Sequence, residues 1–323
     1  MFVYAKENGT LKQYTLTGGE TIPQNAVWID LLNVMPEEKA NVEQFLGIGI
    51  PTHEEMHEIE VSSRLYQEGG AFYMTAILVT NAETREPEIP AVMFVIVGER
   101  LITIRYADPQ PFRVYVTRVE HLPPSQHTGP ALYVGLVKAI VNRMADVLEQ
   151  VGRNIDLLTK QIFRSRATVK EGSKPDYEQL LVDIGGSGDL VSKTHESLVT
   201  LNRMVAFAGQ SSHIAQGENG VHLAVMAKDM EALSDHAMFL SNKVNFLLDA
   251  TLGMIGMEQS NIIKILSVAA VVFLPPTLIA SIYGMNFDFM PELKWLGGYP
   301  LAIVLMVLSA WLPYMYFKRR KWL

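Results

Sequence analysis

The 323-residue chain contains no cysteine. This absence excludes disulfides and thiolate metal sites, including a structural zinc site of the cysteine type. Basic residues are also in the minority, because 27 Lys and Arg stand against 34 Asp and Glu and give a formal net charge of −7. A net negative charge argues against nucleic acid as a partner.

A secretory signal is likewise missing from the start of the sequence, where no basic segment is followed by an apolar stretch. We therefore expect the N-terminal part to stay in the cytoplasm. Two apolar runs, at 262–285 and 300–318, are each long enough to cross a bilayer. The basic residues 318–321 follow the second run and should remain cytoplasmic, which places both termini on that side.

The first 125 residues combine strand-like and helical patterns. Residues 70–79, 91–97 and 101–106 read as strands, and the last two are separated by Gly98-Glu99-Arg100, which is typical of a hairpin. Helical patches are predicted at 36–46 and 52–59. A proline-rich cluster at 123–130 marks the end of this α+β domain.

Helical patterns follow the proline-rich cluster. One helix is predicted at 131–166, and a return helix is predicted from Asp176 to about Ala208. We expect the glycine cluster Gly185-Gly186-Ser187-Gly188 to bend or split the return helix. A phosphate-binding role for this cluster is disfavoured, because no Lys-Ser/Thr pair follows it.

A third helix carries apolar residues at alternating spacings of four and three. Such a period of 3.5 predicts packing in a left-handed supercoil, although the core of a plain helical bundle remains an alternative. No proline occurs from Val221 to Leu274, so we expect this helix to continue into the first apolar run. The repeating residues are Met226, Met230, Leu233, Ala237, Leu240, Val244, Leu247, Thr251 and Met254.

The predicted organisation is a cytosolic α+β domain followed by long helices and two C-terminal transmembrane helices. Its parts are the α+β domain at 1–125, a helical hairpin at 126–210, a stalk helix at 211–261, transmembrane helices at 262–285 and 300–318, an outer loop at 286–299 and a basic cytosolic tail at 319–323.

Six residues of the first apolar run share one helix face that mixes small, hydroxylated and bulky apolar side chains. Such a face can line a narrow pore when several copies surround an axis, but ordinary helix–helix packing favours the same residue types. The bulky Leu266 and Leu274 are candidates for a hydrophobic constriction, and Pro275-Pro276 should bend or loosen the helix. The face consists of Ile263, Leu266, Ala270, Leu274, Thr277 and Ser281.

The segment after the first apolar run carries the most specific motif, Gly284-Met285-Asn286. Together with Met290-Pro291-Glu292-Leu293 and the basic C-terminal end at 318–323, it resembles the CorA family of magnesium channels. The resemblance implies a funnel-shaped homopentamer in a bacterial inner membrane. In it, Gly284, Met285 and Asn286 form the outer selectivity ring.

Magnesium sheds its water slowly, so neutral amide and carbonyl oxygens can hold the hydrated ion without trapping it. The acidic loop residues Asp288 and Glu292 can raise the local concentration of cations. Magnesium is then the substrate rather than a catalytic cofactor.

The resemblance also implies regulation by cytosolic magnesium bound between neighbouring subunits. Asp249 matches a family aspartate on the lower pore. At the aligned position of the main acidic site this chain has Val225, so Asp229, Glu231 and Asp235 are candidates only by proximity. A solvated helix face explains these acidic residues equally well.

His53-Glu54-Glu55-Met56-His57 fits the H-E-x-x-H pattern of zinc proteases. Thr52 and Glu55 also fit a helix capping box, and no recognisable third ligand follows. The metalloprotease interpretation is therefore disfavoured. The pair of histidines could still bind a transition metal adventitiously.

Three functions remain open from the sequence. The favoured one is a divalent-cation channel that conducts hydrated magnesium, with cobalt and nickel as further ions, and that is gated by cytosolic magnesium. The second is a zinc transporter of the same superfamily, and the 290–293 loop favours the magnesium branch over it. The third is a membrane-anchored cation sensor that does not conduct. No convincing nucleophile–base set or nucleotide site predicts an enzyme.

Overall fold

The structure is a computed structural model that describes residues 1–323 except 57, 59, 169–175, 286–289, 321 and 323. The chain forms two compact units, Met1–Leu248 and Asp249–Leu323. The division falls inside one long helix, α7 (Glu218–Tyr283). Each unit is described by itself below.

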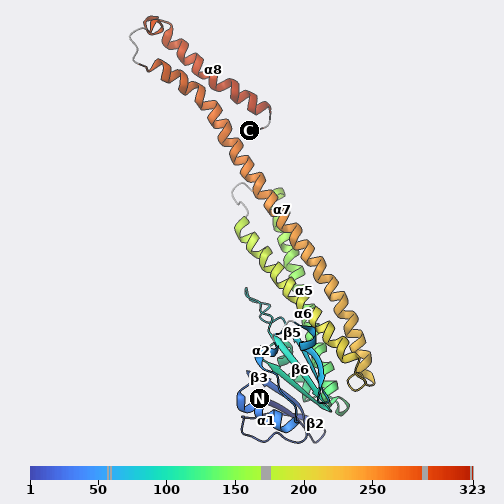
Figure 1. The fold of residues 1–323 in the computed structure, drawn as a ribbon. Helices are drawn as coiled ribbons and strands as arrows, with labels where there is room; N and C mark the ends of the chain where they lie inside the picture. The colour runs from blue at the N-terminus through green and yellow to red at the C-terminus, as the bar shows by residue number, and fades with distance from the viewer. Residues whose placement is uncertain (57, 59, 169–175, 286–289, 321, 323) are drawn as a thin grey trace. The chain divides into compact units, whose positions relative to one another are not determined.

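A seven-stranded sheet in the order β2-β1-β3-β7-β6-β5-β4 forms the base of the first unit (Figure 1). The β3 and β7 strands pair in parallel, and the other neighbours are antiparallel. The predicted hairpin is confirmed as β6 and β7, and Gly98 takes a positive φ of 51° at its turn. The strands are β1 (Phe2–Glu7), β2 (Thr10–Thr15), β3 (Ala26–Leu32), β4 (Leu65–Glu68), β5 (Ala71–Ile77), β6 (Ala91–Val97) and β7 (Arg100–Arg105).

The described residues of this region also form the short helices α1 (Pro36–Leu46), α2 (His53–Met56), α3 (Val61–Arg64) and α4 (Gln110–Val119). The predicted helix at 36–46 is confirmed. The predicted helix at 52–59 is shorter than expected, because α2 ends at Met56 and the described residues Glu58 and Glu60 are not helical.

The central strands are buried on both faces, which explains their nearly continuous apolar sequences. One face carries an apolar core that includes Val3, Ile29 and Ile102 and packs with Val42 of α1. On the other face, Phe94 of β6 meets Tyr133 of the following long helix, with ring centroids 5.8 Å apart. The sheet thus supports the long helices through an aromatic contact as well as aliphatic packing.

Two long antiparallel helices, α5 (Gly129–Thr168) and α6 (Tyr177–Gly209), form the predicted hairpin (Figure 1). Asp176 caps α6 by accepting a hydrogen bond from the backbone N–H of Gln179. Of the predicted bend or split at the glycine cluster, the split is wrong, because α6 runs without interruption through 185–188, and the bend stays a prediction. One glycine has a packing role, since a Cβ on Gly188 would lie 3.1 Å from Cγ1 of Val244 on α7.

The periodic residues of α7 form its inner face. Met226, Met230, Ala237, Leu240, Val244, Leu247 and Thr251 are buried, and Leu233 and Met254 are half-buried. In the first unit this face packs on the chain's own hairpin, as the approaches of Val244 to Gly188 and of Leu240 to Gly152 indicate. The stripe therefore builds a bundle core within one chain, the alternative that the sequence left open.

The second unit contains the last part of α7, a short 3₁₀ turn η2 (Pro291–Lys294) and α8 (Gly298–Arg319). Both α7 and α8 are long and apolar enough to cross a membrane. The α7 helix continues as far as Tyr283 through Pro275 and Pro276, so the two prolines do not break it. A further 3₁₀ turn, η1 (Pro124–Gln126), lies in the predicted proline-rich boundary.

Candidate functional site

The predicted pore face lies on the C-terminal part of α7, and its six residues are all exposed. Leu266 and Leu274, the proposed constriction, are 64% and 65% exposed. Val268 is buried and lies about 150° around the helix from the middle of this face, given about 100° per residue. The second unit therefore leaves the predicted pore face uncovered, while the pore role itself stays a prediction.

The hydroxyl of Thr277 donates a hydrogen bond to the carbonyl oxygen of Phe273, one turn earlier, at 2.7 Å. Such a bond satisfies the hydroxyl within its own helix and is commonly associated with bending. The two preceding prolines also remove backbone donors from this stretch. The hydroxyl hydrogen of Thr277 is thus used within the helix, and its oxygen remains available as an acceptor.

The end of α7 leads directly into the Gly284-Met285-Asn286 motif. The N–H of Gly284 donates to the carbonyl oxygens of Ala280 and Ser281 at 3.0 and 3.2 Å, and the N–H of Met285 donates to that of Ile282 at 3.2 Å. Gly284 and Met285 are therefore held on the last turn of the helix, and both are exposed. Asn286 and Asp288 lie outside the described residues. Glu292 lies in η2, and its side chain is not described.

The candidate regulatory acids are all exposed on α7. Asp229 and Glu231 are two residues apart and point about 160° away from each other, so they cannot serve the same site on one side of the helix. Glu231 and Asp235 are one turn apart and share a face. Among the described residues, no three His, Cys, Asp or Glu side chains converge as a metal site would require.

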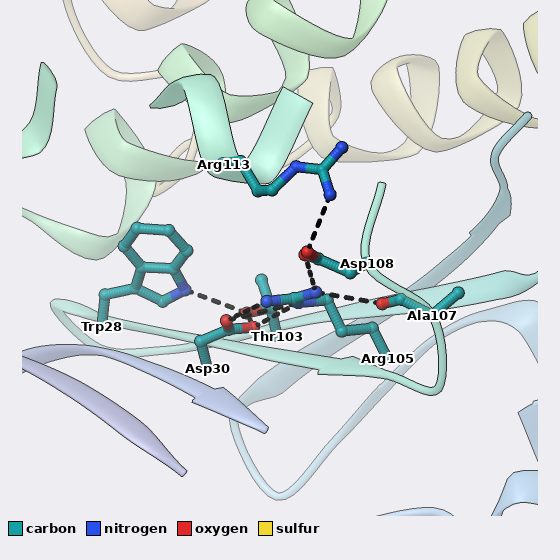
Figure 2. Close-up of polar contacts among 7 residues, drawn as sticks. All are labelled: Trp28, Asp30, Thr103, Arg105, Ala107, Asp108 and Arg113. Carbon is teal, nitrogen blue, oxygen red and sulfur yellow. Dashed lines mark hydrogen bonds and ion pairs between the residues drawn. The ribbon is translucent and has the colours of Figure 1, made fainter. Parts of the chain in front are cut away.

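A buried polar cluster that the sequence did not indicate lies in the first unit (Figure 2). Arg105 of β7 donates to both carboxylate oxygens of Asp30 on β3, with its Nη2 2.8 Å from Oδ2. Thr103 donates to the same carboxylate at 2.7 Å and accepts a hydrogen bond from the indole N–H of Trp28 at 3.0 Å. Each of the charged groups in this part of the cluster is therefore matched by hydrogen bonds.

The cluster extends to the start of α4. Arg105 also donates to the carbonyl oxygen of Ala107 at 3.0 Å and to Asp108 at 2.7 Å, and Asp108 accepts from Arg113 (Figure 2). Burial lowers the pKa of Arg105, but its hydrogen bonds to Asp30 and Asp108 outweigh burial and leave the pKa raised. Because Asp30 and Arg105 are almost fully buried, this cluster joins strands and helix rather than offering a binding site.

The H-E-x-x-H segment is a capped turn in the structure. The backbone N–H of Thr52 donates to Glu55 at 2.7 Å, and the N–H of Glu55 donates to the Thr52 hydroxyl at 3.3 Å, which confirms the capping box. Hydrogen bonds to the Glu55 carboxylate from the backbone and the side chain of Thr52 lower the pKa of Glu55. The His53 ring packs edge-on against Tyr106 at 4.1 Å, and His57 lies outside the described residues.

The fold is that of an α+β unit joined to two helices of membrane-spanning length. A family profile described as CorA-like Mg2+ transporter protein matches residues 23–319. The magnesium transport protein CorA of Escherichia coli strain K12 is 35% identical over 300 residues, which cover 93% of this chain and 92% of that protein. The corresponding protein of Pectobacterium atrosepticum is 34% identical over 298 residues, which cover 92% of each. The chain belongs to the CorA-like Mg2+ transporter family.

Solved structures show the same fold. The complete structure of the CorA magnesium transporter from Methanocaldococcus jannaschii matches with a TM-score of 0.76 at 18% identity, over 100% of this chain and 98% of that one. The full-length CmaX protein matches with a TM-score of 0.73 at 14% identity over the same shares. At these identities the matches establish the fold alone.

Proposed function

We propose that this chain forms a magnesium channel in a bacterial inner membrane, with both termini in the cytoplasm. The observation that carries the proposal is the exposed face of α7, which leads into Gly284-Met285-Asn286 in a member of a magnesium transporter family. Two helices cannot enclose a water-filled path alone, because polar groups in a bilayer need partners or water. Several copies must therefore surround the path.

The family resemblance supports five copies in a funnel, with a formal charge of 5 × −7 = −35. In this assembly the α7 face from Ile263 to Ser281 lines the path, and Leu266 and Leu274 narrow it. Asn286 stands at the outer mouth, where a ring of neutral oxygens holds an ion through its water shell. Asp288 and Glu292 attract cations to the mouth. The chain needs no catalytic activity or cofactor for this function.

Gating by cytosolic magnesium is part of the proposal. Carboxylates on neighbouring copies repel, and a bridging divalent ion converts the repulsion into attraction that holds the copies together. Glu231 and Asp235 supply one such face, whereas Asp229 points elsewhere and would meet a different neighbour. Asp249 supplies a carboxylate further along α7 towards the pore. Loss of the bridging ions then lets the copies separate and opens the path.

The central test measures magnesium uptake into liposomes that contain only the purified protein. Uptake is expected for the parent and abolished by Asn286→Ala, with Asn154→Ala on the exposed surface of α5 as the matched control. Size-exclusion chromatography checks that each variant assembles. Normal uptake by assembled Asn286→Ala would remove the proposed role of the ring.

The same liposomes separate the other functions. A non-conducting cation sensor would bind magnesium and give no uptake. Competition among magnesium, cobalt, nickel and zinc separates a magnesium channel from a zinc transporter of the same superfamily. For gating, Asp249→Asn is expected to weaken closure by magnesium inside the liposome. Closure identical to that of the parent would show that Asp249 takes no part.

A further inference from the structure

The segment that joins η2 to α8 exposes an unusual amount of apolar surface. Trp295, Leu296 and Tyr299 are 60%, 101% and 78% exposed. All three lie within five residues at the start of α8. Exposed aromatic and large aliphatic groups gathered in this way usually mark an interaction surface.

The backbone holds this segment in a defined turn. The N–H of Gly298 donates to the carbonyl oxygen of Trp295 at 2.9 Å, and the N–H of Leu301 donates to that of Gly297 at 3.0 Å. The Trp295 ring lies over Gly297, where an added Cβ would be 2.9 Å from its Cζ2. Glycine is thus required for the indole to pack on the turn, and the exposed side chains are presented on a fixed backbone.

The other end of α8 carries a second group of exposed aromatic residues. Lys318 lies over the Tyr314 ring at 5.9 Å, and Arg320 lies over the Tyr316 ring at 5.8 Å. Aromatic rings combined with basic groups are typical of the level at which a helix leaves a bilayer. Tyr299 and Tyr316 are 17 residues apart along α8, which corresponds to about 26 Å at 1.5 Å per residue. This spacing is close to the hydrocarbon thickness of a bilayer, about 30 Å.

From this spacing we propose that Trp295, Leu296 and Tyr299 form an outer interfacial anchor that rests in the headgroup region of the lipid bilayer. The inference rests on the proposed membrane crossings. Lipid is the fitting partner because Tyr299 is continuous with the exposed apolar surface of α8 on its own side of the helix, where Ile303 and Val307 follow at spacings of four. Tryptophan and tyrosine prefer this region, because their apolar rings can contact lipid while the indole N–H or phenol O–H stays hydrated.

The anchor has a consequence for the adjoining loop. It fixes the outer end of α8 at the membrane surface, and η2 with Glu292 lies directly before it in the chain. The described turn η2 is thereby held close to the membrane surface, because Trp295 follows its last residue, Lys294.

The chain offers an internal test, because its four tryptophans occupy different environments. Trp28 is fully buried in the first unit, Trp311 lies within α8, and Trp322 follows α8 in the tail. Three variants keep Trp28 and carry phenylalanine at other positions: one retains Trp295, one retains Trp311 and one retains neither. Each is placed in liposomes whose lipids carry bromine either near the headgroup or near the bilayer centre, and the loss of fluorescence is measured.

The variant that retains Trp295 is expected to lose more fluorescence with headgroup-level bromine than with central bromine. The variant that retains Trp311 should show the reverse order, and the variant with Trp28 alone should lose little in either case. Trp295 fluorescence that matches the Trp28 background, while Trp311 is quenched, would overturn the anchor and place Trp295 in water or beneath a neighbouring copy. Absence of quenching at Trp311 would instead overturn the membrane crossing of α8.

Discussion

Replacing Asp30 with asparagine tests whether the buried polar cluster stabilises the first unit. The substitution keeps the size of the side chain and removes its charge. Arg105 would then remain buried with its main anionic partner gone, although Asp108 would still accept one of its hydrogen bonds. Thr103 would keep an acceptor, because the amide oxygen can replace a carboxylate oxygen.

The expected loss follows from the burial of both groups. The side chains of Asp30 and Arg105 are 1% and 5% exposed. Removing one partner of a buried ion pair typically costs about 3–5 kcal/mol, and the remaining contact with Asp108 favours about 3 kcal/mol here. For a unit of this size, about 2–4 °C of melting temperature is lost per kcal/mol, so Asp30→Asn should melt about 6–12 °C below the parent.

Thermal unfolding of the full-length protein in detergent, followed by circular dichroism, measures this shift. The matched control is Asp189→Asn, which breaks an exposed pair with Lys193 one turn away on α6. Pairs of that kind contribute about 0.3–0.5 kcal/mol, so the control should shift the melting temperature by about 1–2 °C. Equal shifts for the two variants would refute the argument that burial makes the Asp30 charge essential.

Three further predictions follow from single positions. Gly186→Ala should raise the free energy of unfolding by up to about 1 kcal/mol, because no atom beyond the local helix backbone lies within 4 Å of the added Cβ. Gly135→Ala should lower the free energy of unfolding, because its Cβ would overlap the ring of the buried Tyr115. Melting shifts of the same sign for the two variants would contradict this argument. Leu274→Ser should increase magnesium leak through the closed channel, because it removes an apolar side chain from the proposed constriction. Ile265→Ser, on the other side of α7, should not increase the leak. Equal leak through the two variants would exclude a constriction at residue 274. A hydrogen bond from Lys243 on α7 lowers the pKa of Asp156. The stabilisation that this pair gives is present above pH 3.8 and is lost as the pH falls through the lowered pKa of Asp156. The difference in melting temperature between Asp156→Asn and the parent should therefore shrink in acid, and a difference that grows would contradict this.

Local patterns predicted the elements that depend on neighbours in sequence. The apolar runs around Gly98 predicted the β6–β7 hairpin, because a glycine turn between two strand-forming segments determines their pairing locally. The 4–3 spacing of apolar residues on α7 predicted its buried face for the same reason. The error at the glycine cluster has a tertiary cause. Gly188 lets Val244 approach α6 closely, so packing maintains a helix that intrinsic propensity would weaken.

The buried cluster could not be predicted in this way. Asp30 and Arg105 are 75 residues apart in sequence, and only the parallel pairing of β3 with β7 brings them together. The candidate regulatory acids show a different limit of prediction from sequence patterns. Helix geometry alone separates Asp229 from Glu231, but which acid meets a neighbouring copy depends on an interface that one chain does not contain.

The hydrogen bond between the Thr277 hydroxyl and the carbonyl oxygen of Phe273 decides what Thr277 can offer a hydrated cation. The hydroxyl uses its hydrogen within its own helix, and its oxygen keeps lone pairs that can accept hydrogen bonds. Waters bound to a cation turn their hydrogens outward, so an accepting oxygen suits them. In the proposed channel, Thr277 would therefore meet the ion through its outer waters, about one turn beyond Leu274 along α7.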